Sequence, residues 1–153
     1  MDVDELAAFI VRAKAATYVG GGEHADPCRP GSHDLRFSDG NWAYLDSYFG
    51  GTDFIGEEVV YFAGTPVWAM NYYGRILNDD LLTGAQAGQM IKASLSRMYQ
   101  QGRFLGGFEH VEEHVTYVDA SQGSPEAFQG REFIRREQEI AYELVYHGGL
   151  IRD

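Results

Sequence analysis

Acidic and aromatic side chains alternate in one part of the sequence, and these residues are the best suited to do chemistry. In an extended chain alternate residues share a face, which places one set together: Trp42, Tyr44, Asp46 and Tyr48. Two further sets follow the same rule: Glu58 with Val60 and Phe62, and Trp68 with Met70 and Tyr72. A carboxylate among aromatic rings is costly unless it accepts hydrogen bonds, and tyrosine hydroxyls are suitable donors.

These acidic residues support two interpretations. In the first, Asp46 and Glu58 lie in an aromatic-lined pocket and orient a cationic or hydroxylated small molecule. In the second, tyrosines and acids satisfy one another inside the sheet. Asp119 and Glu132 repeat the same residue types later in the chain, which favours the second interpretation. The sequence alone leaves both open.

Glu143 and His147 form another candidate pair. They lie four residues apart on one predicted strand face, roughly 13 Å along the strand, so each needs a partner from a neighbouring strand. His147 precedes two glycines and is the histidine best placed for acid–base chemistry. A small hydrolase or lyase would combine it with Asp46 or Glu58, whereas the simpler interpretation is a histidine at a strand end. No catalytic residue is assigned.

Three other features have simpler explanations than a reactive site. Residues 110–114 read HVEEH, a zinc-hydrolase pattern that requires a helix, but the residues that follow predict a strand. The glycines at 20–22 neither precede a helix nor carry the Lys-Ser/Thr of a phosphate loop. Cys28 has no identifiable orienting acid. We therefore predict no metal and no cofactor.

Periodicity predicts the elements that position these residues. Asp2 begins a helix with a buried stripe that includes Leu6 and Phe9, and the glycines at 20–22 end it near Tyr18. An irregular, polar loop follows. Alternation with period two then predicts strands over 35–49, 54–62 and 67–76. Thr83 with Gln86 predicts the capping box of a second helix, and further strands follow over 110–119, 131–136 and 139–151.

Two stretches of the chain resemble each other without a gap. Residues 54–77 and 128–151 share Gly56/Gly130, Glu58/Glu132, Tyr72/Tyr146 and Gly74/Gly148. We therefore predict an α+β fold built from two tandem α-β-β-β(β) repeats, about 2–77 and 83–151, within a single domain over 1–153. The repeats would form one antiparallel sheet with two helices related by a pseudo-twofold.

Several motifs together resemble an uncharacterised bacterial domain family of unknown function. They are AKAATYVGGG, RPGSHDLRF, YLDSYFGG, FIGEEVVYFAGTPVWAMNYYGR and YHGGLI. Members of that family are found alone or C-terminal to helix-turn-helix regulators of the phage-repressor type. The resemblance brings no catalytic residues, and it implies a ligand sensor or an oligomerisation unit.

Composition narrows the classes of function. The chain of 153 residues carries 23 acidic against 12 basic residues, a net charge of -11, which disfavours direct nucleic-acid binding. No apolar run is long enough to span a membrane, the N-terminal stretch resembles no signal peptide, and the single cysteine fits a reducing cytoplasm. We predict a non-catalytic, cytoplasmic small-molecule-binding or sensor module that forms a homodimer. A small hydrolase or lyase and a structural oligomerisation unit are the alternatives.

Overall fold

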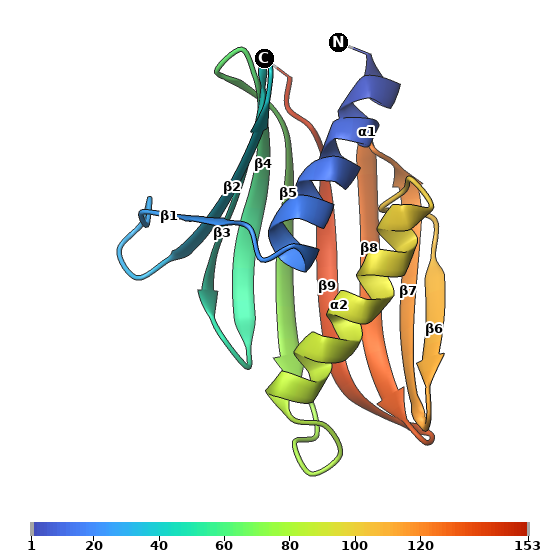
Figure 1. Ribbon diagram of the computed structural model, residues 1–153. Helices are drawn as coiled ribbons and strands as arrows, with labels where there is room; N and C mark the ends of the chain where they lie inside the picture. Colours follow the sequence, from blue (N-terminus) through green and yellow to red (C-terminus); the bar gives the residue numbers. More distant parts are fainter. Residues whose placement is uncertain (1, 153) are drawn as a thin grey trace.

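Nine antiparallel strands form one continuous sheet in the computed structural model, which describes residues 2–152. The strand order is β1-β2-β3-β4-β5-β9-β8-β7-β6, and the helices α1 and α2 both lie on one face of the sheet (Figure 1). Their buried side chains pack against that face, here called the inner face. Neither helix within residues 2–152 is long and apolar enough to cross a membrane.

Both helices begin at the caps that the sequence predicts. Asp2 caps α1 (Val3–Lys14) by accepting a hydrogen bond from the Asp4 N–H. A π-helical turn, η1 (Ala15–Val19), follows directly and carries the chain to the glycines at 20–22. Thr83 and Gln86 form a capping box at the start of α2 (Gly84–Gln100). The caps therefore fix the residue at which each helix begins.

Residues 2–152 contain nine strands, where the sequence predicts six strand segments. Their bounds are β1 (Glu23–Ala25), β2 (His33–Asp39), β3 (Trp42–Gly50), β4 (Phe54–Phe62), β5 (Thr65–Ile76), β6 (Phe108–Glu112), β7 (Val115–Ser124), β8 (Ala127–Arg136) and β9 (Glu139–Leu150). β4 has the predicted bounds because the glycines before it and the Ala63-Gly64 turn after it both interrupt the alternation. The loop predicted to be irregular instead contains the short edge strand β1.

Two segments that were each predicted as one strand form hairpins instead. The segment predicted as one strand over 35–49 turns at Gly40-Asn41, between β2 and β3, where Gly40 has a φ of 61°. The segment predicted over 110–119 turns at Glu113-His114, between β6 and β7, where Glu113 has a φ of 52°. Left-handed backbone at these positions reverses the chain. The HVEEH stretch is therefore a strand end and a turn.

The predicted pair of tandem repeats with a pseudo-twofold is wrong, although the α+β class holds. One sheet runs without interruption through the β5–β9 pairing, with five strands on one side of that junction and four on the other. The shared residues have a local cause. Gly56 lies opposite Tyr72, and Gly130 lies opposite Tyr146, and each tyrosine ring covers its glycine so closely that a Cβ would collide with it. The two hairpins thus share a packing requirement.

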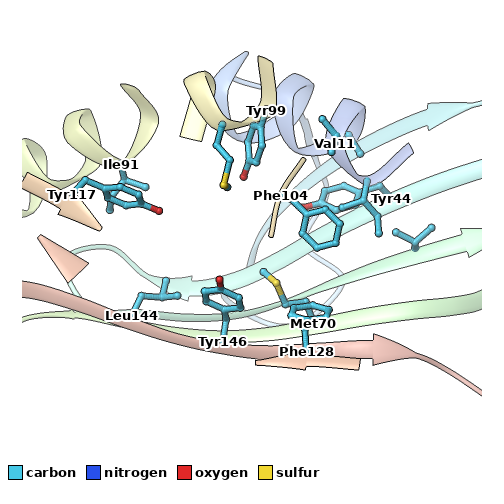
Figure 2. Close-up of a cluster of buried hydrophobic side chains, with 14 of the residues drawn as sticks. Val11, Tyr44, Met70, Ile91, Tyr99, Phe104, Tyr117, Phe128, Leu144 and Tyr146 are labelled. Atoms are coloured by element: carbon cyan, nitrogen blue, oxygen red, sulfur yellow. The ribbon is translucent and has the colours of Figure 1, made fainter. Parts of the chain in front are cut away.

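The core lies between the helices and the inner face of the sheet. Figure 2 shows Leu144, Tyr146 and Met70 rising from the strands towards Ile91 and Tyr99 on α2. The opposite face of the sheet, here called the outer face, carries exposed apolar side chains: Ile55, Tyr73 and Val145. All the candidate residues can be assigned to one face or the other by their parity along the strands.

Candidate functional site

A cavity of about 460 Å³ lies between the inner face of the sheet and the helices. Its wall contains apolar side chains from both sides, such as Met70 and Leu144 from the strands and Ile91 from α2 (Figure 2). It also contains four carboxylates, each at most 7% exposed: Asp46, Glu58, Asp119 and Glu132. This volume is in the range of small-molecule sites.

The first pair of acids comes from neighbouring strands. Asp46 on β3 lies opposite Glu58 on β4, and both face the helices because they alternate with outward-facing residues. The Tyr72 hydroxyl donates a 2.7 Å hydrogen bond to Asp46 Oδ1. Burial and then the charge of Glu58 raise the pKa of Asp46 above its ordinary value, against the opposing effects of Tyr72 and Lys14.

Lys14 supplies a buried positive charge to this pair. It lies at the end of α1 on the same stripe as Ile10, and its Nζ is 2.5 Å from Glu58 Oε2. The lysine is only 5% exposed, so this ion pair is shielded from water. The adjoining π-helical turn brings Tyr18 into the cavity wall, and π-helical turns are frequent at functional sites.

The second pair of acids lies across the sheet on β7 and β8. Asp119 is opposite Glu132, and three tyrosine hydroxyls donate to them. Tyr146 donates to Asp119 Oδ1 at 2.7 Å, Tyr142 donates to Glu132 Oε1 at 2.9 Å, and Tyr117 donates to Glu132 Oε2 at 2.5 Å. Asp119 Oδ2 is buried and has no hydrogen-bond partner within residues 2–152.

Burial controls the protonation of this second pair. It raises the pKa of Glu132 from 4.5 to about 7, although hydrogen bonds from Tyr117 and Tyr142 act in the opposite direction. It also raises the pKa of Asp119, against the hydrogen bond from Tyr146. The pKa values of Tyr142 and Tyr146 are raised well above the ordinary value, again mainly by burial, so these phenols stay protonated and act as donors.

The structure brings together four of the predicted site residues. Asp46, Tyr48, Glu58 and Tyr72 all line the cavity. The other inner-face aromatics belong to the core instead. Trp42 stacks on Phe9 and donates from Nε1 to Glu5, Tyr44 is buried beside it, and Trp68 donates from Nε1 to the Pro125 carbonyl.

Glu143 and His147 lie on the outer face, away from the cavity. Glu143 accepts hydrogen bonds from Arg75 and Arg131, both at 2.8 Å, and these interactions lower its pKa. His147 is exposed, since it alternates with the buried Tyr146. The sheet therefore lies between His147 and the two acids, Asp46 and Glu58, with which it was predicted to act.

Sequence reasoning missed Lys14 and regarded Asp119 and Glu132 as structural. A signal for Lys14 was present, because it is a base on the otherwise apolar stripe of the first helix. For the two acids the signal was a shared strand face with an aromatic residue, Tyr117 two positions before Asp119 and Phe128 four positions before Glu132. Neither pattern shows that the three residues share a cavity with Asp46 and Glu58.

The match to a known family covers most of this site. Residues 46–151 match the family described as Domain of unknown function (DUF5680). The chain belongs to this family. The matched range contains all four cavity carboxylates, whereas Lys14 and Tyr18 precede it. Comparisons with curated proteins and with solved structures gave no match.

Proposed function

We propose that this DUF5680 chain is a non-catalytic binding module that holds a small organic molecule in the cavity under its helices. The observation that carries the proposal is the lining of that cavity. Four buried carboxylates, hydrogen-bonded tyrosines and one buried lysine surround a space of about 460 Å³. Buried polar groups set in a partly apolar wall orient the ligand in small-molecule sites.

Residue Gly88 supports the same function. It lies inside α2 and lines the cavity, and a Cβ at this position would meet no atom within 4 Å. Glycine in a helix interior costs roughly 0.5–1 kcal/mol relative to alanine, and packing does not require it here. Absence of a side chain keeps the space between α2 and the sheet open.

The alternative of a hydrolase or lyase has less support from the geometry. His147 is on the outer face, and the cavity carboxylates are on the inner face. His24 borders the cavity but is exposed, and it makes no hydrogen bond to a carboxylate among the described residues. A sensor role, in which a partner or an attached domain responds to the bound molecule, fits the resemblance to repressor-associated domains.

A screen with a blocked cavity tests the binding function. Thermal unfolding would be followed with a library divided into cationic, neutral and anionic small molecules. The variants are Gly88→Phe, which places a ring in the cavity, and Gln89→Phe, which adds the same ring to an exposed position of α2. We expect at least one class to stabilise the wild type and Gln89→Phe but not Gly88→Phe. Equal stabilisation of all three proteins, or of none, would contradict the proposal.

A homodimer through the outer face is a second candidate, with a second copy of the chain as the partner. Ile55 pairs with Tyr73, and Tyr73 with Val145, so the three exposed side chains form an apolar row across β4, β5 and β9. We expect Tyr73→Lys to shift the sedimentation coefficient from dimer to monomer. Identical monomeric coefficients for both proteins would exclude this interface.

A further inference from the structure

Two buried carboxylate oxygens of the cavity have no hydrogen bond among the described residues: Glu58 Oε2, which faces Lys14 in an ion pair, and Asp119 Oδ2. Asp119 is 5% exposed and lines the cavity, and its Oδ1 is satisfied by the Tyr146 hydroxyl. Its Oδ2 is buried and unpartnered. A buried acceptor without a donor costs about 1–3 kcal/mol, and more for a charged group. A ligand that donates a hydrogen bond at this point would remove that cost.

The part of the cavity around the acids presents many acceptors. The hydroxyls of Tyr72, Tyr142 and Tyr146 each donate their single proton to a carboxylate, so each phenol oxygen offers only lone pairs to a ligand. The Lys14 ammonium is directed to Glu58 at 2.5 Å. Tyr18, Tyr48 and Tyr99 line other parts of the wall and can donate, so the need for a donor from the ligand is local to Asp119 Oδ2.

The charges in the cavity favour a positively charged donor. Four buried carboxylates face a single buried base, Lys14, among the described residues that line the cavity, and Lys92 is exposed at the rim. Above pH 7, where Glu132 is also ionised, an anion would be repelled and a neutral molecule would leave the acidic charge uncompensated. Lys14 itself shows how the site holds an ammonium group, since it pairs with Glu58 and lies 5.8 Å from the Phe104 ring centroid.

An organic cation fits better than a metal ion. Within residues 2–152 no group of three or more His, Cys, Asp or Glu side chains is arranged to hold a metal. The volume of about 460 Å³ is that of an organic ligand, and apolar residues such as Ile91 and Leu144 contribute to the wall. An amine with an apolar or aromatic body would satisfy both parts of the lining.

We infer that the ligand is an organic amine, and that its ammonium group binds the Asp119–Glu132 pair while Lys14 remains paired with Glu58. The inference rests on the proposed binding function and specifies the chemical class of the ligand. Asp119 Oδ2 accepts one ammonium N–H, and the rings of Tyr142 and Tyr146 flank the remaining bulk. The ligand enters beside Gly88, where α2 presents no side chain.

Calorimetric titration with matched probes tests the charge of the ligand. The probes are benzylamine and 1,5-diaminopentane, their neutral counterparts benzyl alcohol and 1,5-pentanediol, and the anion benzoate. We expect at least one amine to bind the wild type at least tenfold more tightly than its neutral counterpart, and no binding of benzoate. If the alcohols bind as tightly as the amines, and Gly88→Phe abolishes both, the binding function stands and the cation assignment is overturned.

Asp119→Asn tests the position of the ammonium group. Asparagine keeps an acceptor for Tyr146 and removes the charge, so amine affinity should fall at least tenfold, and by more than the affinity for alcohols. Glu109→Gln removes an exposed acid from the adjacent strand β6 and should have no effect. Equal amine affinity in all three proteins overturns the assignment.

If Asp119→Asn does not fold cooperatively, Glu132→Gln replaces it with the same expected loss. A wild type that binds no probe also overturns the inference, and the Gly88→Phe screen then decides whether any ligand class binds.

Discussion

The protonation of Glu132 should make the stability of the free protein fall as the pH rises. Below about pH 4 the carboxyl group is protonated in both the folded and the unfolded chain. Between its ordinary pKa of 4.5 and the folded value of about 7, the folded protein keeps a proton that the unfolded chain has released. The free energy of unfolding therefore decreases through this window, and above pH 7 the whole penalty is present.

The size of this effect follows from the interval between the two pKa values. At about 1.4 kcal/mol per pH unit, the interval from 4.5 to about 7 corresponds to roughly 3 kcal/mol. Glu132→Gln removes the titrating group and keeps an acceptor for Tyr117 or Tyr142. Any hydrogen bond that it weakens lowers stability equally at every pH. The free energy of unfolding of this variant, relative to wild type, should therefore rise by roughly 3 kcal/mol between pH 4.5 and pH 8.

Urea denaturation at half-unit pH intervals measures this difference. Glu57→Gln is the matched control, because Glu57 is exposed on the outer face of β4, one residue from the buried Glu58. Its stability should run parallel to that of the wild type. If the Glu132→Gln curve were also parallel to the wild type from pH 4.5 to pH 8, then Glu132 would not hold a proton in the folded protein, and the account of the buried acids would fail.

Three other substitutions test the packing around the cavity, each by urea denaturation. Gly88→Ala should raise the free energy of unfolding by roughly 0.5–1 kcal/mol, since its Cβ meets open space; a loss would show that the space is filled. Lys14→Met should lower it by about 3–5 kcal/mol at pH 8, because Glu58 loses its buried partner, and the double variant Lys14→Met/Glu58→Gln should recover most of the loss. Gly130→Ala should lower it by about 1–3 kcal/mol, because its Cβ would collide with the Tyr146 ring; a gain like that of Gly88→Ala would contradict the register of β8 and β9.

Local signals predicted the helices and strand β4 well, but they missed the turn between β2 and β3. At this turn the residues that face the helices change from odd to even numbers. Caps act within four residues, so Asp2 and Thr83 could be recognised without knowledge of the fold. Phe37 faces the helices from an odd position and Trp42 from an even one, which requires a turn between them. The Asp39-Gly40 pair within this interval is a hairpin signal in its own right. The missed turn was therefore readable in the sequence.

The charge of the cavity could not be predicted from local sequence patterns, because it depends on which distant residues the fold brings together. Asp46, Glu58, Asp119 and Glu132 come from four strands, and all but Glu58 accept a hydrogen bond from a tyrosine. Hydrogen bonds from tyrosines satisfy such acids without neutralising them. Among the described residues that line the cavity, Lys14 is the one buried base and pairs with Glu58, while Arg103 acts on the charge of Asp119 from outside the lining. One buried ammonium for four buried acids is a property of the folded cavity, and a cationic ligand is the group that would complete it.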